Sequence, residues 1–385
     1  MPYDALCRAV PDLPAALDDL AALHDDEAIW PLLRRLLEAP APSGGANLPG
    51  GVGEVIGALA SELGLGANWI PELGETGNAA LSLGADGPPT LIAVAHMDRP
   101  SFRVRSPESG ALFPICANRF PQGEYRTGAK ALRFADGRLV VGAQGAIVSR
   151  RQNGRDTLAF ETADGALAWQ DTVVMAVEPV LSADGTVTGT GLDNALGVLT
   201  ALLAASALAR VERTLTALGV RLLVVFTDQE EGPPEAFFGH GAARLAYAVP
   251  APRGVVVVDA HGGDEPDGPT LGAGAAHGFV SGWGRGSIVP PNAQALALDL
   301  AAGVNRARAG TVQFDTGYLS RSDDMALERW AKVMALIGPP MLHAHTGDET
   351  ARLADVRSSA IWLAWFLAAG LALSPVIGAR YALTR

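Results

Sequence analysis

Several ionisable side chains directly follow apolar stretches of the sequence. His96 and Asp98 come after the run "LIAVA", Glu230 and Glu231 follow "LLVVFTDQ", and Asp259 follows "VVVV". Such runs are typical of buried strands, and the carboxyl ends of parallel strands meet at one edge of an open sheet, where ligands bind. We therefore expect these side chains to converge at one site, although they are distant in the sequence.

Two further candidates belong to the same edge. Asp193 lies in "GTGLDNALGV" at the start of an expected helix, and His345 follows the apolar stretch "VMALIGPPML". Imidazole and carboxylate groups in this number suit two divalent ions about 3.5–4 Å apart that share one carboxylate. Zinc accepts this mixture of ligands, as do cobalt and manganese. The sequence therefore predicts two divalent metal ions, Zn²⁺ in the first place and Co²⁺ or Mn²⁺ as alternatives.

The adjacent acids Glu230 and Glu231 can take two different roles. One carboxylate can bind a metal ion while its neighbour takes a proton from the attacking water. Each motif alone has a simpler explanation, because a His-x-Asp pair or a Glu pair can be a solvated strand end, and Asp193 or Asn194 can cap a helix. The coincidence of all these motifs at strand ends favours the dinuclear site. The other histidines, His24, His240, His261 and His277, have weaker claims to it.

The pattern along the chain predicts how these residues are positioned. Helical and buried-strand patterns alternate before residue 102 and after residue 182, which predicts an α/β fold with a mixed, mostly parallel sheet flanked by helices. Residues 14–38 are expected to be helical with a break at Pro31. Residues 103–181 show short alternating segments with Asp-Gly turns, typical of a small β-barrel-like domain. We therefore expect residues 1–102 and 182–385 to form one catalytic domain, with residues 103–181 inserted into it.

Composition and charge exclude several classes of protein. The 385 residues, 49% hydrophobic and 18% charged, can bury a sizeable core, and the net charge of −12 argues against binding nucleic acid or an anionic membrane. Cys7 and Cys116 are the only cysteines and lack the spacing of a disulfide framework or a zinc knuckle. We expect a cytoplasmic protein without an export signal.

One segment has the length of a membrane span. It is "AIWLAWFLAAGLALSPVIGA", residues 360–379. Its many alanines and its place at the end of an α/β chain favour a helix packed on the sheet and ended by Pro375. No membrane association is therefore expected.

The order of the motifs resembles that of the glutamyl aminopeptidase, or tetrahedral aminopeptidase, family of dinuclear metallopeptidases. The motifs are "AHMD", a β insertion, "GLDNALGV", "TDQEEG", "VVVVDAHGGDEPDGPTLGAG" and "HAHTGDETARLADV". Together they cover most of the chain between residues 50 and 370. The resemblance implies a zinc-peptidase-like catalytic domain with an inserted β domain, and self-association into dimers or larger assemblies.

The same resemblance implies a role for each candidate residue. Five positions would bind the ions: His96 and Asp259 the first, Glu231 and His345 the second, and Asp193 both. Glu230 would be the general base. Asp98 would orient the ligand histidine by accepting a hydrogen bond from its ring, which fixes the tautomer. His343 is the alternative to His345, but only His345 keeps the family's register with Glu349.

Two segments depart from the family pattern. Arg99, Pro100 and Ser101 stand where the family has Glu-Ile-Gly, and "SRSDD", residues 320–324, replaces Gly-Gly-Thr-Asp. Arg321 could pair with an acidic substrate side chain, or it could pair within its own loop with Asp323 or Asp324. The preferred N-terminal residue therefore cannot be carried over from the family.

The sequence thus predicts a metalloaminopeptidase that hydrolyses N-terminal residues from peptides. An N-acyl amino acid deacylase or carboxypeptidase of a related dinuclear family is the first alternative, although its inserted domain is usually an αβ lid. A non-catalytic metal-binding homologue is the second alternative. The presence of Glu230, which is needed for chemistry rather than for metal affinity, argues against a non-catalytic protein.

Overall fold

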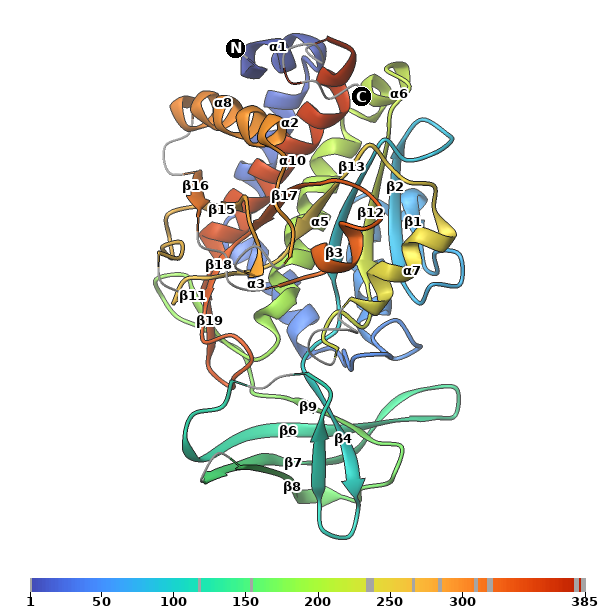
Figure 1. Cartoon of the computed structure of the whole chain (residues 1–385), viewed down its shortest axis with the longest axis vertical. Helices are drawn as coiled ribbons and strands as arrows, with labels where there is room; N and C mark the ends of the chain where they lie inside the picture. The colour runs from blue at the N-terminus through green and yellow to red at the C-terminus, as the bar shows by residue number, and fades with distance from the viewer. Residues whose placement is uncertain are drawn as a thin grey trace.

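The chain folds into a helix-flanked body with a separate small barrel at one end (Figure 1). The structure, a computed structural model, describes residues 2–116, 119–152, 155–232, 239–264, 267–282, 286–307, 311–316, 321–376 and 381.

An eight-stranded mixed sheet forms the centre of the larger body. Across the sheet the strands are β1 (Trp69–Ile70), β2 (Ala79–Gly84), β12 (Arg221–Thr227), β3 (Leu91–His96), β13 (Gly254–Val258), β17 (Val333–Gly338), β15 (Ala275–Gly278) and β16 (Val312–Asp315). The pairs β12–β3, β3–β13, β13–β17 and β15–β16 are parallel, and the other three pairs are antiparallel. Every residue of β3 and β13 is buried, as expected for strands covered on both faces.

Helices pack around this sheet. The described helices are α1 (Pro2–Ala9), α2 (Leu13–Leu23), α3 (Asp26–Glu38), α4 (Val52–Glu62), the 3₁₀ turn η1 (Gly66–Asn68), α5 (Leu192–Ala209), α6 (Glu212–Ala217), α7 (His240–Ala248), α8 (Pro291–Ala307), α9 (Asp324–Leu327) and α10 (Leu353–Val376). The long helices α5 and α10 pack against each other and against β3. They carry much of the hydrophobic core.

The N-terminal helical region breaks at a different place from the predicted one. α3 continues through Pro31, and the break lies between α2 and α3. Asp25 begins α3 as its N-cap, because its carboxylate accepts a hydrogen bond from the Ala28 amide at 2.9 Å. The capping carboxylate therefore sets the helix boundary, and Pro31 removes only one hydrogen bond inside the helix.

Two strongly apolar helices lie inside the molecule. Among the described helices, α5 has the length and hydropathy of a membrane span, and 83% of that window is buried. The predicted membrane-length segment belongs to α10 as far as Val376, and residues 377–380 lie outside the described residues. Trp362 and Phe366 are fully buried in the core, and α10 continues through Pro375 rather than ending before it.

A second, smaller sheet has five strands. Its strands are, in order, β10 (Val180–Leu181), β11 (Thr186–Gly189), β19 (Glu349–Arg352), β18 (Pro340–Leu342) and β14 (His261–Gly262). The loop between β18 and β19 contains His345. This sheet therefore holds a loop that carries one of the predicted ligands.

Six strands close into a barrel with its own core. In barrel order they are β4 (Ser101–Ser106), β5 (Ala111–Pro114), β8 (Arg155–Gly165), β7 (Arg138–Gln152), β6 (Gly123–Ala135) and β9 (Thr172–Met175). The β6–β7 turn uses Asp136 and Gly137, both with positive φ, as the Asp-Gly signal predicts. The predicted mixed α/β fold with an inserted β-barrel-like domain is confirmed. The domain boundaries at residues 103 and 181 stay a prediction, since the barrel strands begin at Ser101 and β10 pairs outside the barrel.

Candidate metal centre

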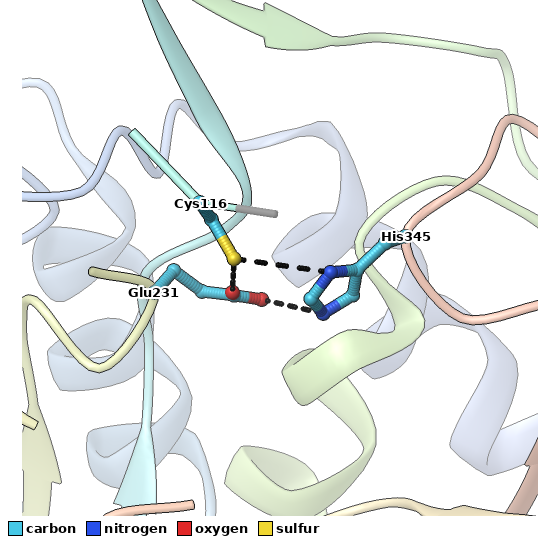
Figure 2. Close-up of side chains that lie close together, drawn as sticks. All are labelled: Cys116, Glu231 and His345. Carbon is cyan, nitrogen blue, oxygen red and sulfur yellow. Dashed lines mark hydrogen bonds and ion pairs between the residues drawn. The ribbon is translucent and has the colours of Figure 1, made fainter. Parts of the chain in front are cut away.

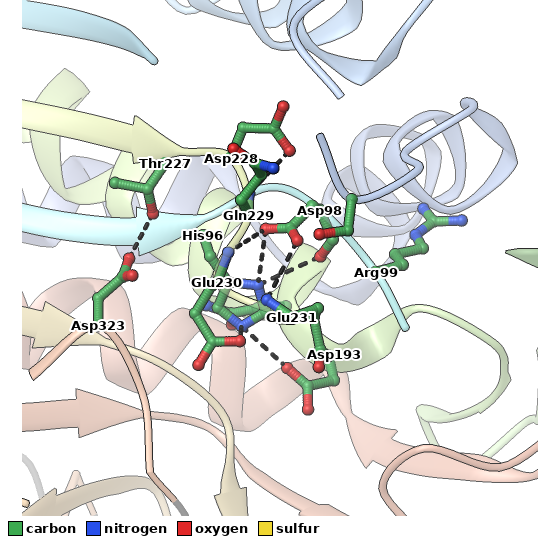
Figure 3. Close-up of polar contacts among 12 residues, drawn as sticks. His96, Asp98, Arg99, Asp193, Thr227, Asp228, Gln229, Glu230, Glu231 and Asp323 are labelled. Atoms are coloured by element: carbon green, nitrogen blue, oxygen red, sulfur yellow. Dashed lines mark hydrogen bonds and ion pairs between the residues drawn. The ribbon is translucent and has the colours of Figure 1, made fainter. Parts of the chain in front are cut away.

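Three adjacent strands bring distant residues to one edge of the large sheet. His96 is the last residue of β3, Asp259 follows β13, and Glu230 and Glu231 follow shortly after β12. Both β12 and β13 pair with β3 in parallel, so all three strands end on the same side. The structure therefore brings together the residues that the strand-end pattern predicted. Figure 3 shows His96, Asp98, Glu230 and Glu231 of this group.

Asp193 reaches the same edge from the start of α5. The neighbouring Asn194 accepts a hydrogen bond from the Gly197 amide and donates one to the Val258 carbonyl, both at 2.8 Å. Asn194 thus caps the helix and fastens it to the end of β13. The peptide bond between Asp193 and Asn194 is cis. The Asp193 carboxylate faces the site.

The first cluster consists of His96, Asp193 and Asp259. His96 Nε2 lies 3.1 Å from Asp193 Oδ1 and 3.5 Å from Asp259 Oδ1. One potential ligand atom from each residue lies within 4.8 Å of those of the other two. Burial opposes a charged ring, but the carboxylates of Glu230 and Asp259 raise the pKa of His96 well above its ordinary value.

The second cluster shares Asp193 with the first. His345 Nε2 lies 3.3 Å from Asp193 Oδ2 and 3.2 Å from Glu231 Oε1. The two oxygens of Asp193 therefore face one histidine each. His343, the alternative ligand, is exposed, and its Nδ1 lies 3.2 Å from the Asp348 carbonyl oxygen. The geometry thus places His345, and not His343, in the cluster.

These clusters fit divalent metal ions. Two ligands bound to one zinc ion at about 2.0–2.1 Å with tetrahedral angles lie roughly 3.3 Å apart, close to the separations of the nitrogen and oxygen atoms here. Asp193 Oδ1 and Glu231 Oε1 are buried and have no hydrogen-bond partner among the described residues. Burial opposes ionisation, but the two histidines lower the pKa of Asp193 below its ordinary range. Divalent ions would supply the positive charge that these two oxygens lack.

Asp98 organises the backbone of the two adjacent acids. Its carboxylate oxygens accept hydrogen bonds from the amides of Glu230, at 3.0 Å, and Glu231, at 3.1 Å. His96 Nδ1 lies 3.8 Å from the Asp98 carboxylate but 3.2 Å from its carbonyl oxygen. The carbonyl is thus the nearer acceptor for the ring, because the carboxylate is directed at the two amides. Burial raises the pKa of Asp98 to about 6, partly offset by His96.

Glu230 lies beside the first cluster. Its Oε2 is 3.9 Å from His96 Nε2, too far for a hydrogen bond, and its side chain is only 3% exposed. Burial, together with the charges of Glu231, Asp259 and Asp323, raises the pKa of Glu230 well above its ordinary value. Proton transfer is favoured by a carboxylate whose proton affinity has been raised in this way.

Glu349 connects the two segments that carry Asp193 and His345. Its Oε2 accepts hydrogen bonds from the amides of Leu192, at 2.7 Å, and Asp193, at 3.4 Å, while its Oε1 accepts one from the His345 amide at 3.0 Å. Burial and the charge of Asp193 raise the pKa of Glu349 to about 8. The sequence showed its register with His345 but not this positioning role.

Cys116 is a member of the second cluster that was not predicted. Its thiol donates a hydrogen bond to Glu231 Oε2 at 2.8 Å, and its sulfur lies 3.9 Å from His345 Nδ1 (Figure 2). Burial and the charge of Glu231 raise the pKa of the Cys116 thiol strongly. The residue follows β5 in the barrel, and a lone cysteine without a spacing motif gave no signal in the sequence.

The two segments that depart from the family pattern have structural partners. Arg99 is buried and donates hydrogen bonds to the carbonyls of Leu36 and Leu37 in the last turn of α3. Asp323 accepts a hydrogen bond from the Thr227 hydroxyl, and burial raises its pKa to about 7. Arg321 is partly buried, and Ser320 lies outside the described residues.

Among the described residues, the remaining histidines belong to neither of the two clusters. His261 Nδ1 lies 2.8 Å from Asp315 Oδ2, and His277 Nδ1 accepts a hydrogen bond from Trp362 Nε1 at 3.0 Å. Both rings are fully buried. His24 and His240 lie at helix ends, at the C-terminal cap of α2 and the first position of α7.

Comparisons with known proteins identify the fold. No family model and no curated protein matches the chain. The TET1 peptidase of Pyrococcus horikoshii, which can assemble into a tetrahedron or a large octahedral shell, is 17% identical with a TM-score of 0.65, over 87% of this chain and 97% of that one. An aminopeptidase of Desulfurococcus kamchatkensis is 19% identical with a TM-score of 0.66, over 87% and 93%.

A TET aminopeptidase from a marine sediment thaumarchaeote is also similar. It is 14% identical with a TM-score of 0.67, over 87% of this chain and 94% of that one. The chain therefore has the fold of the tetrahedral aminopeptidases over almost their entire length. At these identities the likeness shows the fold, and the chemistry has to be argued from the site.

Proposed function

We propose that this protein is a metalloaminopeptidase with two divalent ions, which releases N-terminal residues from peptides. The observation that supports it most is the arrangement of His96 and His345 on either side of Asp193, with a different oxygen of that carboxylate facing each ring. A carboxylate shared in this way is what a two-metal site needs. The fold, common to proteins named aminopeptidases, supports the same activity.

The chain would divide its ligands between two subsites. His96, Asp259 and Asp193 Oδ1 would hold one ion, and Glu231, His345 and Asp193 Oδ2 would hold the other. Zn²⁺ suits these nitrogen and oxygen ligands, and Co²⁺ or Mn²⁺ could replace it. When bound, two such ions polarise the scissile carbonyl and make water a stronger nucleophile.

Glu230 would act as the general base and then as the general acid. It takes a proton from the attacking water, whose oxygen forms the new bond to the carbonyl carbon. It then delivers that proton to the amine nitrogen as the peptide C–N bond breaks. Asp98 holds the backbone of Glu230 through the amide hydrogen bond at 3.0 Å and so positions the base.

The decisive experiment compares unblocked and N-acetylated peptides with Zn²⁺, Co²⁺ or Mn²⁺ added. Hydrolysis of the unblocked peptides alone supports an aminopeptidase, whereas cleavage of blocked substrates supports the deacylase or carboxypeptidase alternative. Glu230→Gln should lose about 10²–10⁴-fold in kcat while keeping both ions. The control is Glu54→Gln, since Glu54 is exposed on α4. An active Glu230→Gln variant, or no hydrolysis of any peptide by metal-loaded wild type, would overturn the proposal.

We also propose that the chain forms homo-oligomers in the cytoplasm. The Pyrococcus horikoshii protein with this fold can assemble into a tetrahedron or a large octahedral shell. The barrel of the present chain exposes large apolar side chains, including Phe113, Phe134 and Val141, which an interface could bury. Light scattering coupled to size-exclusion chromatography should give a mass of at least two chains, and a monomer at micromolar concentration would contradict this part of the proposal.

A further inference from the structure

The inserted barrel contributes one side chain to the second subsite of the proposed metal centre. Cys116 follows β5, and its side chain is directed at Glu231 and His345, which belong to the larger body (Figure 2). The residue is only 6% exposed. The following inference rests on the proposed two-metal function, because it concerns how the chain prepares that subsite.

The contact with Glu231 separates the two oxygens of its carboxylate. The thiol donates to Oε2 at 2.8 Å, while Oε1 lies 3.2 Å from His345 Nε2. Glu231 Oε1 is buried without a hydrogen-bond partner among the described residues, and its side chain is 2% exposed. One oxygen is thus held by sulfur, and the other is directed into the subsite with an unused lone pair.

The contact with His345 selects between its two ring nitrogens. The sulfur lies 3.9 Å from Nδ1, whereas the other ring nitrogen, Nε2, lies 3.3 Å from Asp193 Oδ2. A proton on Nδ1 can be donated to sulfur, a weak acceptor, while the S–H is donated to Glu231. Nε2 then carries the lone pair, and it faces Asp193 Oδ2 and Glu231 Oε1.

We propose that Cys116 is a positioning residue for the second metal subsite, holding Glu231 and His345 so that Oε1 and Nε2 are both directed at the place of one ion. Its chain of contacts, Nδ1–H to sulfur and S–H to Oε2, fixes the tautomer of the histidine and the binding mode of the carboxylate together. Partners outside the ligand set commonly act in this way. The packing of the barrel against the larger body therefore affects the affinity of the second subsite for its metal ion.

In the first subsite, the Nδ1 atom of the histidine faces a backbone carbonyl instead of a thiol. His96 Nδ1 lies 3.2 Å from the carbonyl oxygen of Asp98, which belongs to the segment that follows β3. A change at Cys116 should therefore affect the second ion selectively. A residue that merely filled space between the barrel and the body would not distinguish the two ions.

The test measures metal binding without using peptidase activity. The full chain is stripped of metal and titrated with Zn²⁺ in competition with a chromophoric chelator, and with Co²⁺ while its absorption spectrum is recorded.

Wild type should bind two ions. Cys116→Ala should leave the first affinity unchanged and weaken the second by about 10–100-fold. Cys116→Ser should recover most of the second affinity, because a hydroxyl also donates and accepts. Cys7→Ser, on α1, is the matched control and should behave as wild type.

Each contrary result has a distinct meaning. Equal affinity for the second ion in wild type and Cys116→Ala would overturn the positioning role. A strong thiolate-to-Co²⁺ charge-transfer band in wild type would overturn it too, because Cys116 would then be a ligand itself. If Cys116→Ala fails to fold, a folded Cys116→Ser variant with greatly weakened second-ion binding would equally contradict the proposal. Binding of fewer than two ions by wild type would instead reject the two-metal centre on which the proposal rests.

Discussion

The Asp98 carboxylate uses both of its oxygens to hold the backbone amides of Glu230 and Glu231. An asparagine in its place offers one acceptor oxygen, so one amide would face an NH₂ group and lose its hydrogen bond. We predict that Asp98→Asn lowers kcat by about 10–100-fold, because the proposed base and its neighbouring ligand are displaced together. Steady-state kinetics with saturating metal would measure the effect. Asp184→Asn, a change of an exposed acid, is the control, and an unchanged kcat in Asp98→Asn would show that the two amide bonds do not position Glu230.

At the scale of single residues, the sequence predicted the members of the two clusters that lie at strand ends. His96, Asp259 and the Glu pair follow apolar runs, and parallel strands necessarily bring their ends together. Cys116 could not be found in this way, because its approach to the centre depends on how the barrel docks. The role of Glu349 was likewise hidden, since three amides from two segments meet at its carboxylate only after folding.

Among the structural elements, the loop between β18 and β19 receives support from the barrel. The hydroxyl of Tyr125, on β6, accepts a hydrogen bond from the Gly347 amide at 2.7 Å, two positions after His345. A side-chain methyl at Gly347 would approach Thr127 Oγ1 to 2.5 Å, so the barrel and the loop are closely packed there. The loop that carries His345 is therefore held partly by the inserted domain.

We predict that Tyr125→Phe weakens binding of the second ion. The loss of one hydrogen bond of about 1 kcal/mol corresponds to about fivefold in the dissociation constant, if the loop is free to move when that bond is absent. Metal competition on the full chain would measure it. Tyr247→Phe is the control, because Tyr247 on α7 is 93% exposed. A dissociation constant unchanged by Tyr125→Phe would mean that the remaining contacts alone fix the loop.

His277, on β15, makes the packing of α10 sensitive to acid. Its ring accepts a hydrogen bond from Trp362 Nε1 and meets Phe279 and Phe314 edge-on, and burial lowers its pKa to about 3, with the charge of His261 contributing. In the unfolded chain the same imidazole binds a proton near pH 6.5, whereas in the folded protein it stays neutral until the pH approaches 3. The stability contributed by the neutral ring is therefore complete above pH 6.5 and is lost as the pH falls toward 3.

We predict that His277 accounts for about 2 kcal/mol of the fall in the free energy of unfolding between pH 7.5 and pH 5. His277→Asn keeps an acceptor for Trp362 but does not titrate in this range, so its loss of stability over the same interval should be smaller by that amount. Urea unfolding of both proteins at the two pH values would give the difference. Parallel pH profiles would show that the ring becomes charged without cost in the folded protein.

The elements themselves were predictable to different degrees. Buried apolar runs located β3, β12 and β13 correctly, because burial on both faces leaves no polar alternation. The break near Pro31 was predicted wrongly, since Asp25 caps α3 earlier and the proline is accommodated inside the helix. The short alternating segments of the barrel were recognisable as β-strands in the sequence. The order in which they pair was not, because it depends on contacts between distant segments.

On the scale of the whole molecule, the insertion point of the barrel lies next to the candidate centre. The chain passes from His96 at the end of β3 into β4, and it returns from β9 through β10 and β11 to Asp193 at the start of α5 (Figure 1). The predicted ligands His96 and Asp193 therefore flank the inserted domain in the sequence. From the barrel, Cys116 contacts Glu231 after β12, and Tyr125 contacts Gly347 in the loop that carries His345. Metal binding and the relative placement of barrel and body are thus expected to stabilise each other.

The concentration of acids at this junction gives the last prediction. The buried carboxylates of Glu230, Glu231 and Asp259 and the partly exposed carboxylate of Asp193 lie around two histidines, so without cations the folded state must retain protons there or accept repulsion. An ion that binds only the folded state stabilises it by about 2.7 kcal/mol at a free concentration of 100 times its Kd. For a chain of 385 residues this corresponds to a rise in Tm of about 3 °C per ion.

Differential scanning calorimetry should therefore show a Tm about 6–7 °C higher with saturating Zn²⁺ than with excess chelator. Asp193→Asn, which weakens both subsites, should show a much smaller difference. Identical Tm values for wild type in Zn²⁺ and in chelator would mean that the acids are stabilised by protons alone and that no divalent ion completes the folded centre.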